Sequence, residues 1–479
     1  MRALPHYLQC KYTATDKLTR LVMVSSRLLL MTVPLIFSSS VHANSPKIKL
    51  KPLSLEQAVK QAQTLDPWLT GNIHQQQALE ALSIAANTLP DPKVSIGIAN
   101  IAADSFSFSQ EPMTQFQVGI SQLFPRGDTL ALMNQQLKTQ SMQYPYLRQD
   151  RQAQVAVTVG TLWLNAYQMQ QSIALIEQNK SLFTQLIDVA EARYSSTIGQ
   201  AQQQDIVRAE LELSRIDDKL VQFNQLKNSY LGQLDQWLTS TNASEFNRQN
   251  IKLSSKLPEI ELQQKTLIMT PAHDANTVLL GYFSEHPSVI ALDNKIKATA
   301  FDKALAKQKY QPEWGVNASY GYRGDDAFNN SRADLFSLGI TFDVPLFTEN
   351  KQDQELKAAV SKTEAVKTEK QLRLRQLLGS FSATKGRLLQ LIKRKALYQD
   401  KLLPQFHQQA DIALNAYTND TGDFGDIVRA RIDELNAATD FIAITVEQQK
   451  LHLALNYVFS QAQTPLSNRQ IKSAQLRQE

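Results

Sequence analysis

The sequence has little cysteine and, after its first residues, no long apolar run. Its one cysteine, Cys10, lies near the start of the 479-residue chain. The rest of the protein therefore has neither a disulfide framework nor thiol chemistry. Beyond residue 43 no stretch of about 18 residues, the length of a membrane-spanning helix, is uniformly apolar. The sequence predicts no transmembrane helix.

The sequence also lacks the motifs of common enzymes and metal sites. There is no glycine-rich phosphate loop, no Gly-x-Ser-x-Gly and no His-Glu-x-x-His. The histidines after residue 43 are scattered, and none has a second histidine or a cysteine at ligand spacing. We predict a protein that is not an enzyme and that binds neither a cofactor nor a metal ion.

The net charge of +5 is concentrated at the N-terminus. Residues 1–43 carry five basic side chains and one acidic side chain, so the remaining chain is close to neutral. This balance argues against a nucleic-acid partner. Arg27 precedes an apolar run at 28–37, and Val41 and Ala43 fit the small-residue rule for signal cleavage. We expect residues 1–43 to be a signal peptide that is removed on export.

What the chain does contain is an internal repeat. The pentamer Asp-Ile-Val-Arg-Ala occurs at 205–209 and again at 426–430. Further pairs recur at a constant offset of 220 residues: Pro67 and Pro287, Pro92 and Pro312, Gly119 and Gly339, Pro125 and Pro345. A constant offset predicts two structural repeats. We place them at 44–238 and 277–461, with a polar and irregular segment at 239–276, either a linker or a small side structure, and a loose polar tail at 462–479.

Each repeat combines strand-like and helix-like periodicity. Alternating apolar and polar residues predict strands at 93–101, 114–124, 313–322 and 334–344. Their length suits tilted membrane strands of about 9–11 residues. Long helices are predicted at 128–197, with a kink at Pro145, at 202–238, at 348–418, with an interruption at Pro404, and at 425–461. Apolar residues at alternating spacings of three and four in the second of these predict a left-handed coiled coil. A shorter helix precedes each pair of strands, and Ser54 with Gln57 forms a capping box before the first.

Four strands are too few to close a barrel, and an open sheet edge is not tolerated in lipid. Several copies of the chain must therefore combine. Strand counting alone leaves two chains with eight strands and three chains with twelve as alternatives. Very long helices around a wide lumen favour three chains.

This pattern resembles the TolC-type outer-membrane efflux family over nearly all of the mature chain. The resemblance depends on residues 53–58, on Pro125 and Pro345 at strand-to-helix turns, and on the two Tyr…Gly…Asp-Ile-Val-Arg-Ala turns. It implies an α+β membrane protein: a homotrimer with a twelve-stranded β-barrel in outer-membrane lipid and an α-helical tunnel in the periplasm. It also implies a periplasmic adaptor protein and an inner-membrane RND-type pump as partners. Residues 91–92, 111–114 and 124–127 look closest to the heavy-metal-cation branch.

By the resemblance, the two repeated turns form the periplasmic end of the tunnel, which narrows to a gate and meets the adaptor. The gate candidates are Asp205, Arg208, Asp420, Asp423, Asp426 and Arg429, and the turn and adaptor candidates are Tyr194, Gly199, Tyr417, Gly422 and Gly425. The glycines are expected at positive φ, where tight turns need them.

Two interpretations of the charged residues stay open. Asp205 and Asp426 begin the returning helices, where a carboxylate that caps a helix contributes about 0.5–2 kcal/mol. Alternatively, three copies of Asp420, Asp423 and Asp426 ring the pore and favour cations, while Arg208 and Arg429 pair with neighbouring helices and hold the gate shut. The tyrosines either pack at the tip or contact the adaptor.

The expected function is the exit duct of a tripartite efflux system for small toxic solutes, with heavy-metal cations as the class that the suspected branch implies. One alternative is the outer-membrane duct of a type I protein secretion system. Another is a periplasmic coiled-coil scaffold without a pore.

Overall fold

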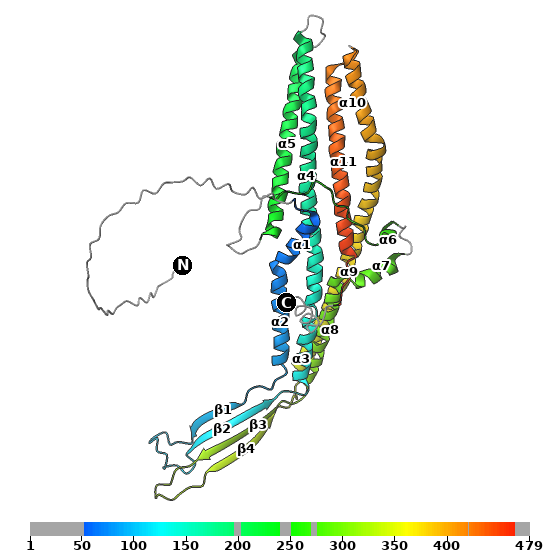
Figure 1. Ribbon diagram of the computed structural model, residues 1–479. Coiled ribbons are helices and arrows are strands. Elements are labelled where there is room, and N and C mark those ends of the chain that lie inside the picture. Colours follow the sequence, from blue (N-terminus) through cyan, green and yellow to red (C-terminus); the bar gives the residue numbers. More distant parts are fainter. Residues whose placement is uncertain (1–51, 196–202, 240–250, 270–274, 420, 465–479) are drawn as a thin grey trace, which may run out of the picture. The chain divides into compact units, whose positions relative to one another are not determined.

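The computed structural model describes residues 52–195, 203–239, 251–269, 275–419 and 421–464 (Figure 1). The expected signal peptide and the candidates Gly199 and Asp420 lie outside the described residues. Within these ranges, no helix combines the length and apolar character that crossing a membrane requires.

Two short helices lead to the first pair of strands. Helix α1 (Leu55–Leu65) begins at the predicted capping box, which is confirmed: the Ser54 hydroxyl accepts a hydrogen bond from the Gln57 amide, and the Gln57 side chain accepts one from the Ser54 amide. The carboxylate of Asp66 caps α2 (Pro67–Ala85), whose first residue is the proline. At the matching place 220 residues later, His286 caps α8 (Pro287–Gln308), which also begins with proline.

The long helix predicted at 128–197 is two helices, so the single helix was wrong. Helix α3 (Thr129–Ser141) ends before Met142 and Gln143, and α4 (Tyr144–Ser195) follows. Pro145 explains the break, because proline lacks the N–H that would bond to the carbonyl of Ser141 in a continuous helix. In the first turn of α4 that N–H is not needed. Helix α5 (Gln203–Leu238) is continuous.

The second long helix is interrupted close to the predicted position, Pro404. Helix α9 (Gln352–Leu397) passes through a π-helical turn (Tyr398–Leu402) into α10 (Leu403–Thr418), where Pro404 is in the first turn. The wider π turn accommodates the missing proline N–H without a chain reversal. Helix α11 (Phe424–Val458) then returns alongside α10.

The sheet has four strands in the order β1-β2-β3-β4, all antiparallel to their neighbours (Figure 1). The strands are β1 (Lys93–Ala99), β2 (Gln115–Phe124), β3 (Trp314–Tyr322) and β4 (Leu335–Phe342). Strands β2 and β3 join the two halves of the chain, with Gly119 opposite Ser319. Within the chain, β1 and β4 each have one unpaired edge.

Apolar clusters hold the helices together and include part of the segment at 239–276. One cluster surrounds Trp163 and Leu234, and another surrounds Phe283 and Phe381. The segment at 239–276 was expected to be either an irregular linker or a small side structure. Its described residues pack against the helices, as a side structure would: Leu253 is buried in the first cluster and pairs with Leu53, and Ile268 of α6 (Lys265–Met269) is buried in the second. Helix α7 (Ala275–Ser284) adds Phe283.

A buried polar network connects four helices near the end of α11. The Nε2–H of His286 donates to the carbonyl of Tyr457 (3.1 Å), so Nδ1 is the acceptor for the amide and hydroxyl of Ser288 (3.2 and 2.8 Å). Arg373 of α9 donates to the hydroxyls of Ser288 (2.7 Å) and Tyr457 (2.6 Å). The Tyr457 hydroxyl donates to Asp150 of α4 (2.9 Å). The donors and acceptors form one consistent chain, which is why these polar groups are buried without loss.

Burial shifts the protonation of this network. It lowers the pKa of His286 to about 4, and the nearby Arg373 charge acts in the same direction. It raises the pKa of Asp150, although the hydrogen bond from Tyr457 and the Arg373 charge act against the increase. The imidazole is therefore neutral at neutral pH, as its acceptor role at Nδ1 requires.

Candidate functional site

The two faces of the sheet differ in chemistry. Residues directly opposite each other on paired strands share a face, so the register assigns every strand residue. The even-numbered residues form a face that is apolar except for Gln122: Val94, Ile96, Ile98, Phe116, Val118, Ile120, Gln122, Phe124, Trp314, Val316, Ala318, Tyr320, Tyr322, Phe336, Leu338, Ile340 and Phe342. Its side chains remain exposed in the single chain, for example Ile96 at 69%.

The opposite face is polar and almost uncharged. Its residues are Lys93, Ser95, Gly97, Ala99, Gln115, Gln117, Gly119, Ser121, Leu123, Gly315, Asn317, Ser319, Gly321, Leu335, Ser337, Gly339 and Thr341. Lys93, at the start of β1, is the one charged side chain among these strand positions. A sheet with one apolar and one polar face suits a boundary between lipid and water.

The strand-to-helix turns hold the predicted prolines, Pro125 after β2 and Pro345 after β4. Arg126 connects these turns: its guanidinium pairs with Asp343 and donates to the carbonyl of Lys309 (2.9 Å) before β3. Gly127 has a φ of +45°, the one positive φ of a described glycine, so a residue with a side chain would be strained there. These contacts fix the points at which β2, β3 and β4 meet their helices.

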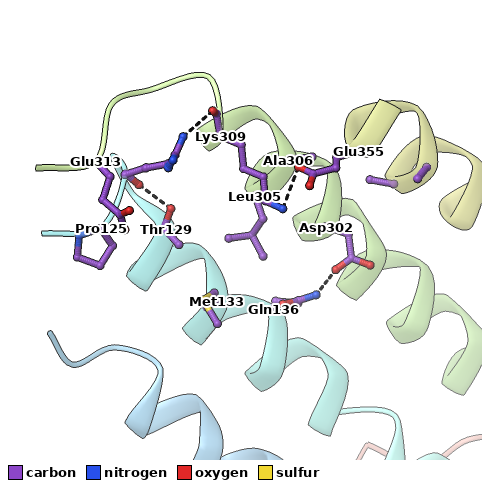
Figure 2. Close-up of a pocket in the computed structure, with 13 residues that line it drawn as sticks. Pro125, Thr129, Met133, Gln136, Asp302, Leu305, Ala306, Lys309, Glu313 and Glu355 are labelled. Carbon is purple, nitrogen blue, oxygen red and sulfur yellow. Dashed lines mark hydrogen bonds and ion pairs between the residues drawn. The ribbon is translucent and has the colours of Figure 1, made fainter. Parts of the chain in front are cut away.

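A cavity of about 580 Å³ lies beside these turns (Figure 2). Met133 of α3 and Leu305 of α8 line its apolar part. Its charged rim is paired within the chain, Lys309 with Glu355 (2.9 Å) and Asp302 with the amide of Gln136. The carboxylates of Glu355 and Asp302 are thus engaged within the chain.

The two repeated turns meet in one apolar cluster. It contains Ala190 of α4, Ala209 of α5, Tyr417 of α10, and Phe424, Ile427 and Val428 of α11. Three residues of the repeated pentamers, Ala209, Ile427 and Val428, are thus buried where the two helical hairpins touch. We call this region, with the ends of the four helices, the tip.

Arg193 is a tip residue that sequence reasoning missed. It extends from the last turn of α4 to the end of α10, where it donates to the carbonyls of Tyr417 (3.0 Å) and Thr418 (3.4 Å). Its guanidinium also lies 4.2 Å from the centre of the Tyr417 ring. The contact satisfies carbonyls that the helix end leaves without a helical partner and places a cation at the negative end of the helix dipole. The sequence could have indicated Arg193, because this arginine directly precedes the turn candidate Tyr194.

Arg208 makes a second contact between the hairpins. Its guanidinium lies against Gly425, where an added Cβ would collide with it. Asp205, also on α5, is 7% exposed, so it is placed inside the chain rather than on its surface. Both residues therefore lie at the packed tip.

The acidic residues of the second turn differ from expectation. The cap of α11 is Asp423, whose carboxylate accepts a bond from the Gly425 amide (3.3 Å), so the cap predicted for Asp426 was wrong. Asp426 lies in the first helical turn and pairs with Arg429 of the same helix (2.9 Å). Arg429 was expected to reach a neighbouring helix. Within the chain both members of this pair are exposed, so it adds little to stability.

The predicted tyrosines and glycines of the turns differ in burial and in backbone conformation. Tyr417 is 6% exposed, whereas Tyr194 is 53% exposed. Gly422 and Gly425 do not have the positive φ that was predicted. Gly422 is required for space, because an added Cβ would lie 2.9 Å from the Cβ of Ala416. The chain reverses there through bonds from the Thr421 and Gly422 amides to the Ala416 carbonyl (2.9 and 3.1 Å).

No protein-family model matches the sequence, and no curated protein matches it. Solved structures do. The Campylobacter jejuni CmeC outer membrane channel is 15% identical, with a TM-score of 0.68, and the match covers 88% of each chain. CusC, solved in a study of transmembrane channel formation, is 10% identical, with a TM-score of 0.67 over 85% of this chain and 92% of that one. The chain has the fold of these outer-membrane channels.

The open state of the Neisseria gonorrhoeae MtrE outer membrane channel also has this fold, at 13% identity and a TM-score of 0.64, over 85% of this chain and 88% of that one. At such low identity the likeness shows the channel fold and not the solute. Among the described residues, no group of three or more His, Cys, Asp or Glu side chains has an arrangement that could hold a metal ion.

Proposed function

We propose that the protein is an outer-membrane channel and the exit duct of a tripartite efflux system. The observation that carries the proposal is the sheet: an exposed apolar face, a polar face and two unpaired edges. An apolar surface of this extent is not stable in water. Placed in outer-membrane lipid, it is covered, while the polar face borders a water-filled lumen.

The unpaired edges support a closed assembly of several copies. In lipid each edge must find a partner, because no water replaces the lost hydrogen bonds. Strand β4 of one copy pairs with β1 of the next, which continues the antiparallel order. Three copies give a homotrimer with twelve strands and a coiled-coil tunnel in the periplasm. Each copy then consists of two repeats, at 44–238 and 277–461, behind a cleaved signal peptide.

The tip is proposed as the gated end of the tunnel. The contacts of Arg193 and Arg208 hold the second hairpin (α10 and α11) against the first (α4 and α5), and breaking them widens the tip. The exposed Tyr194 contacts the periplasmic adaptor, which connects the duct to an inner-membrane RND-type pump. The duct itself carries out no chemistry.

The solutes proposed are small toxic compounds, with heavy-metal cations as one class. A strain that lacks the protein should become sensitive to the solutes that its pump exports, and the wild-type gene should restore resistance. Sensitivity to no toxic solute, together with loss of a secreted protein, would favour the type I secretion duct. Recovery from the soluble periplasm rather than the outer membrane would favour the scaffold and contradict the channel.

A further inference from the structure

Two exposed apolar patches flank the sheet at the end where the helices join it. The first, the α2 patch, consists of Leu82, Ile84 and Leu89 at the end of α2 and in the link to β1. The second, the turn patch, consists of Val344, Leu346 and Phe347 between β4 and α9. Ile84 is 70% exposed and Phe347 is 90% exposed. Large apolar side chains at such exposure usually mark a contact surface.

The turn patch is held rigidly. The amide of Leu346 donates to the carbonyl of Val344 (2.9 Å), which closes a γ-turn around Pro345. The proline ring fixes φ near the value that an inverse γ-turn needs. Asp343, immediately before the turn, is anchored by Arg126 and accepts a bond from the Glu313 amide (2.6 Å). Leu346 and Phe347 are thus presented at a fixed place, which lowers the entropy cost of binding.

The topology places the two patches at opposite edges of the same end of the sheet. Because neighbouring strands are antiparallel, β1 starts and β4 ends at this end. The α2 patch directly precedes β1, and the turn patch directly follows β4. When β4 of one copy pairs with β1 of the next, the turn patch of the first copy therefore meets the α2 patch of the second.

We propose that the α2 patch and the turn patch form a hydrophobic contact between neighbouring copies of this chain. The proposal rests on the closed assembly of the proposed function. The occupant is a second copy rather than lipid for two reasons. The α2 patch lies largely on a helix, outside the strands assigned to lipid, where water would otherwise surround it. The edge pairing that completes the sheet also brings the two patches together in every copy.

Cysteine cross-linking in the full chain tests this contact. In a Cys10→Ser background, Ile84→Cys combined with Phe347→Cys should give covalent dimers and trimers with a short bis-maleimide. A matched pair, Leu226→Cys with Phe347→Cys, uses an exposed leucine on α5 and should stay monomeric on denaturing gels. A third pair, Ile96→Cys on β1 with Leu338→Cys on β4, reports edge pairing alone.

The three pairs separate the two proposals. Cross-linking by the edge pair but not by the Ile84 and Phe347 pair would overturn the patch contact and leave the closed assembly intact. Cross-linking by neither pair, in protein recovered from the outer membrane, would overturn the closed assembly itself. Lipid is the remaining occupant: in reconstituted vesicles and a Trp314→Phe background, strong quenching by brominated phospholipid of the fluorescence that Phe347→Trp adds would contradict the contact, whereas weak quenching is expected.

Discussion

The guanidinium of Arg193 lies over the ring of Tyr417 and also bonds to the carbonyl of that residue, at 4.2 Å and 3.0 Å. The two residues are 224 positions apart and belong to different hairpins. One side chain therefore terminates α10, covers a buried aromatic ring and joins the two halves of the tip.

Removal of this side chain should open the proposed gate. Arg193→Ala loses two charge-assisted hydrogen bonds, worth about 1.5–3 kcal/mol each, with the 3.4 Å bond to Thr418 near the low end. We expect a larger single-channel conductance than in the wild type, and an intermediate value for Arg193→Lys, which keeps the charge but lacks the planar fork. Arg215→Ala is the control, since Arg215 is exposed and pairs within its own helix. Equal conductance of Arg193→Ala and the wild type would exclude a gating role.

The two aspartates of α11 should respond differently to substitution. Asp423→Ala removes the helix cap and should lower the free energy of unfolding by about 1 kcal/mol. Asp426→Ala removes only an exposed pair within the helix and should change it by less. Thermal unfolding of the purified protein measures both.

The same variants test the proposed ring of carboxylates. If three copies of these side chains line the pore, cation selectivity should fall in Asp423→Ala and Asp426→Ala, as measured by reversal potentials in a salt gradient. Unchanged selectivity in both variants would leave helix capping and local pairing as the whole of their role.

Acid should destabilise the buried polar network around His286. The folded-state pKa is lowered from 6.5 to about 4, so below pH 6.5 the unfolded chain binds the proton first. The stabilising effect of neutral His286 is thus present above pH 6.5 and is lost as the pH falls towards 4. Asp150 opposes this, because its raised pKa lets the folded state take up a proton earlier as the pH falls.

The measurement is the melting temperature between pH 7.5 and pH 4, with a variant that cannot titrate. His286→Asn keeps a capping side chain and removes the imidazole. It should be less stable than the wild type at neutral pH and should lose less stability on acidification. Parallel pH profiles for the two proteins would show that His286 does not contribute to the acid sensitivity.

Local patterns in the sequence predicted the elements better than their breaks and contacts. Alternation at 114–124 led directly to β2, because apolar and polar or small residues alternate without interruption from Phe116 to Ser121. The break at Met142 was missed because Pro145 was read as a kink inside one helix, and a proline ring fits either a kink or the first turn of a new helix. The buried Leu253 and Ile268 were hidden in a segment that is polar on average.

The tip was located from the sequence, but its contacts were not. The repeat of Asp-Ile-Val-Arg-Ala treats Asp205 and Asp426 as equivalent, yet one is buried and the other is exposed. Tyr194 and Tyr417 differ in the same way. Which copy is buried depends on the packing of one hairpin against the other, and the Arg193 contact spans 224 positions. Neither the burial of one copy nor the Arg193 contact produces a local pattern in the sequence.

The central claim is that copies of this chain close into an outer-membrane pore. The most direct measurement is the single-channel conductance of the purified full-length protein in a planar lipid bilayer. We expect discrete conductance steps that are carried by an oligomer which resists SDS without heating and separates into monomers on boiling. Protein that inserts into the bilayer without conductance steps, or that is monomeric before heating, would contradict it.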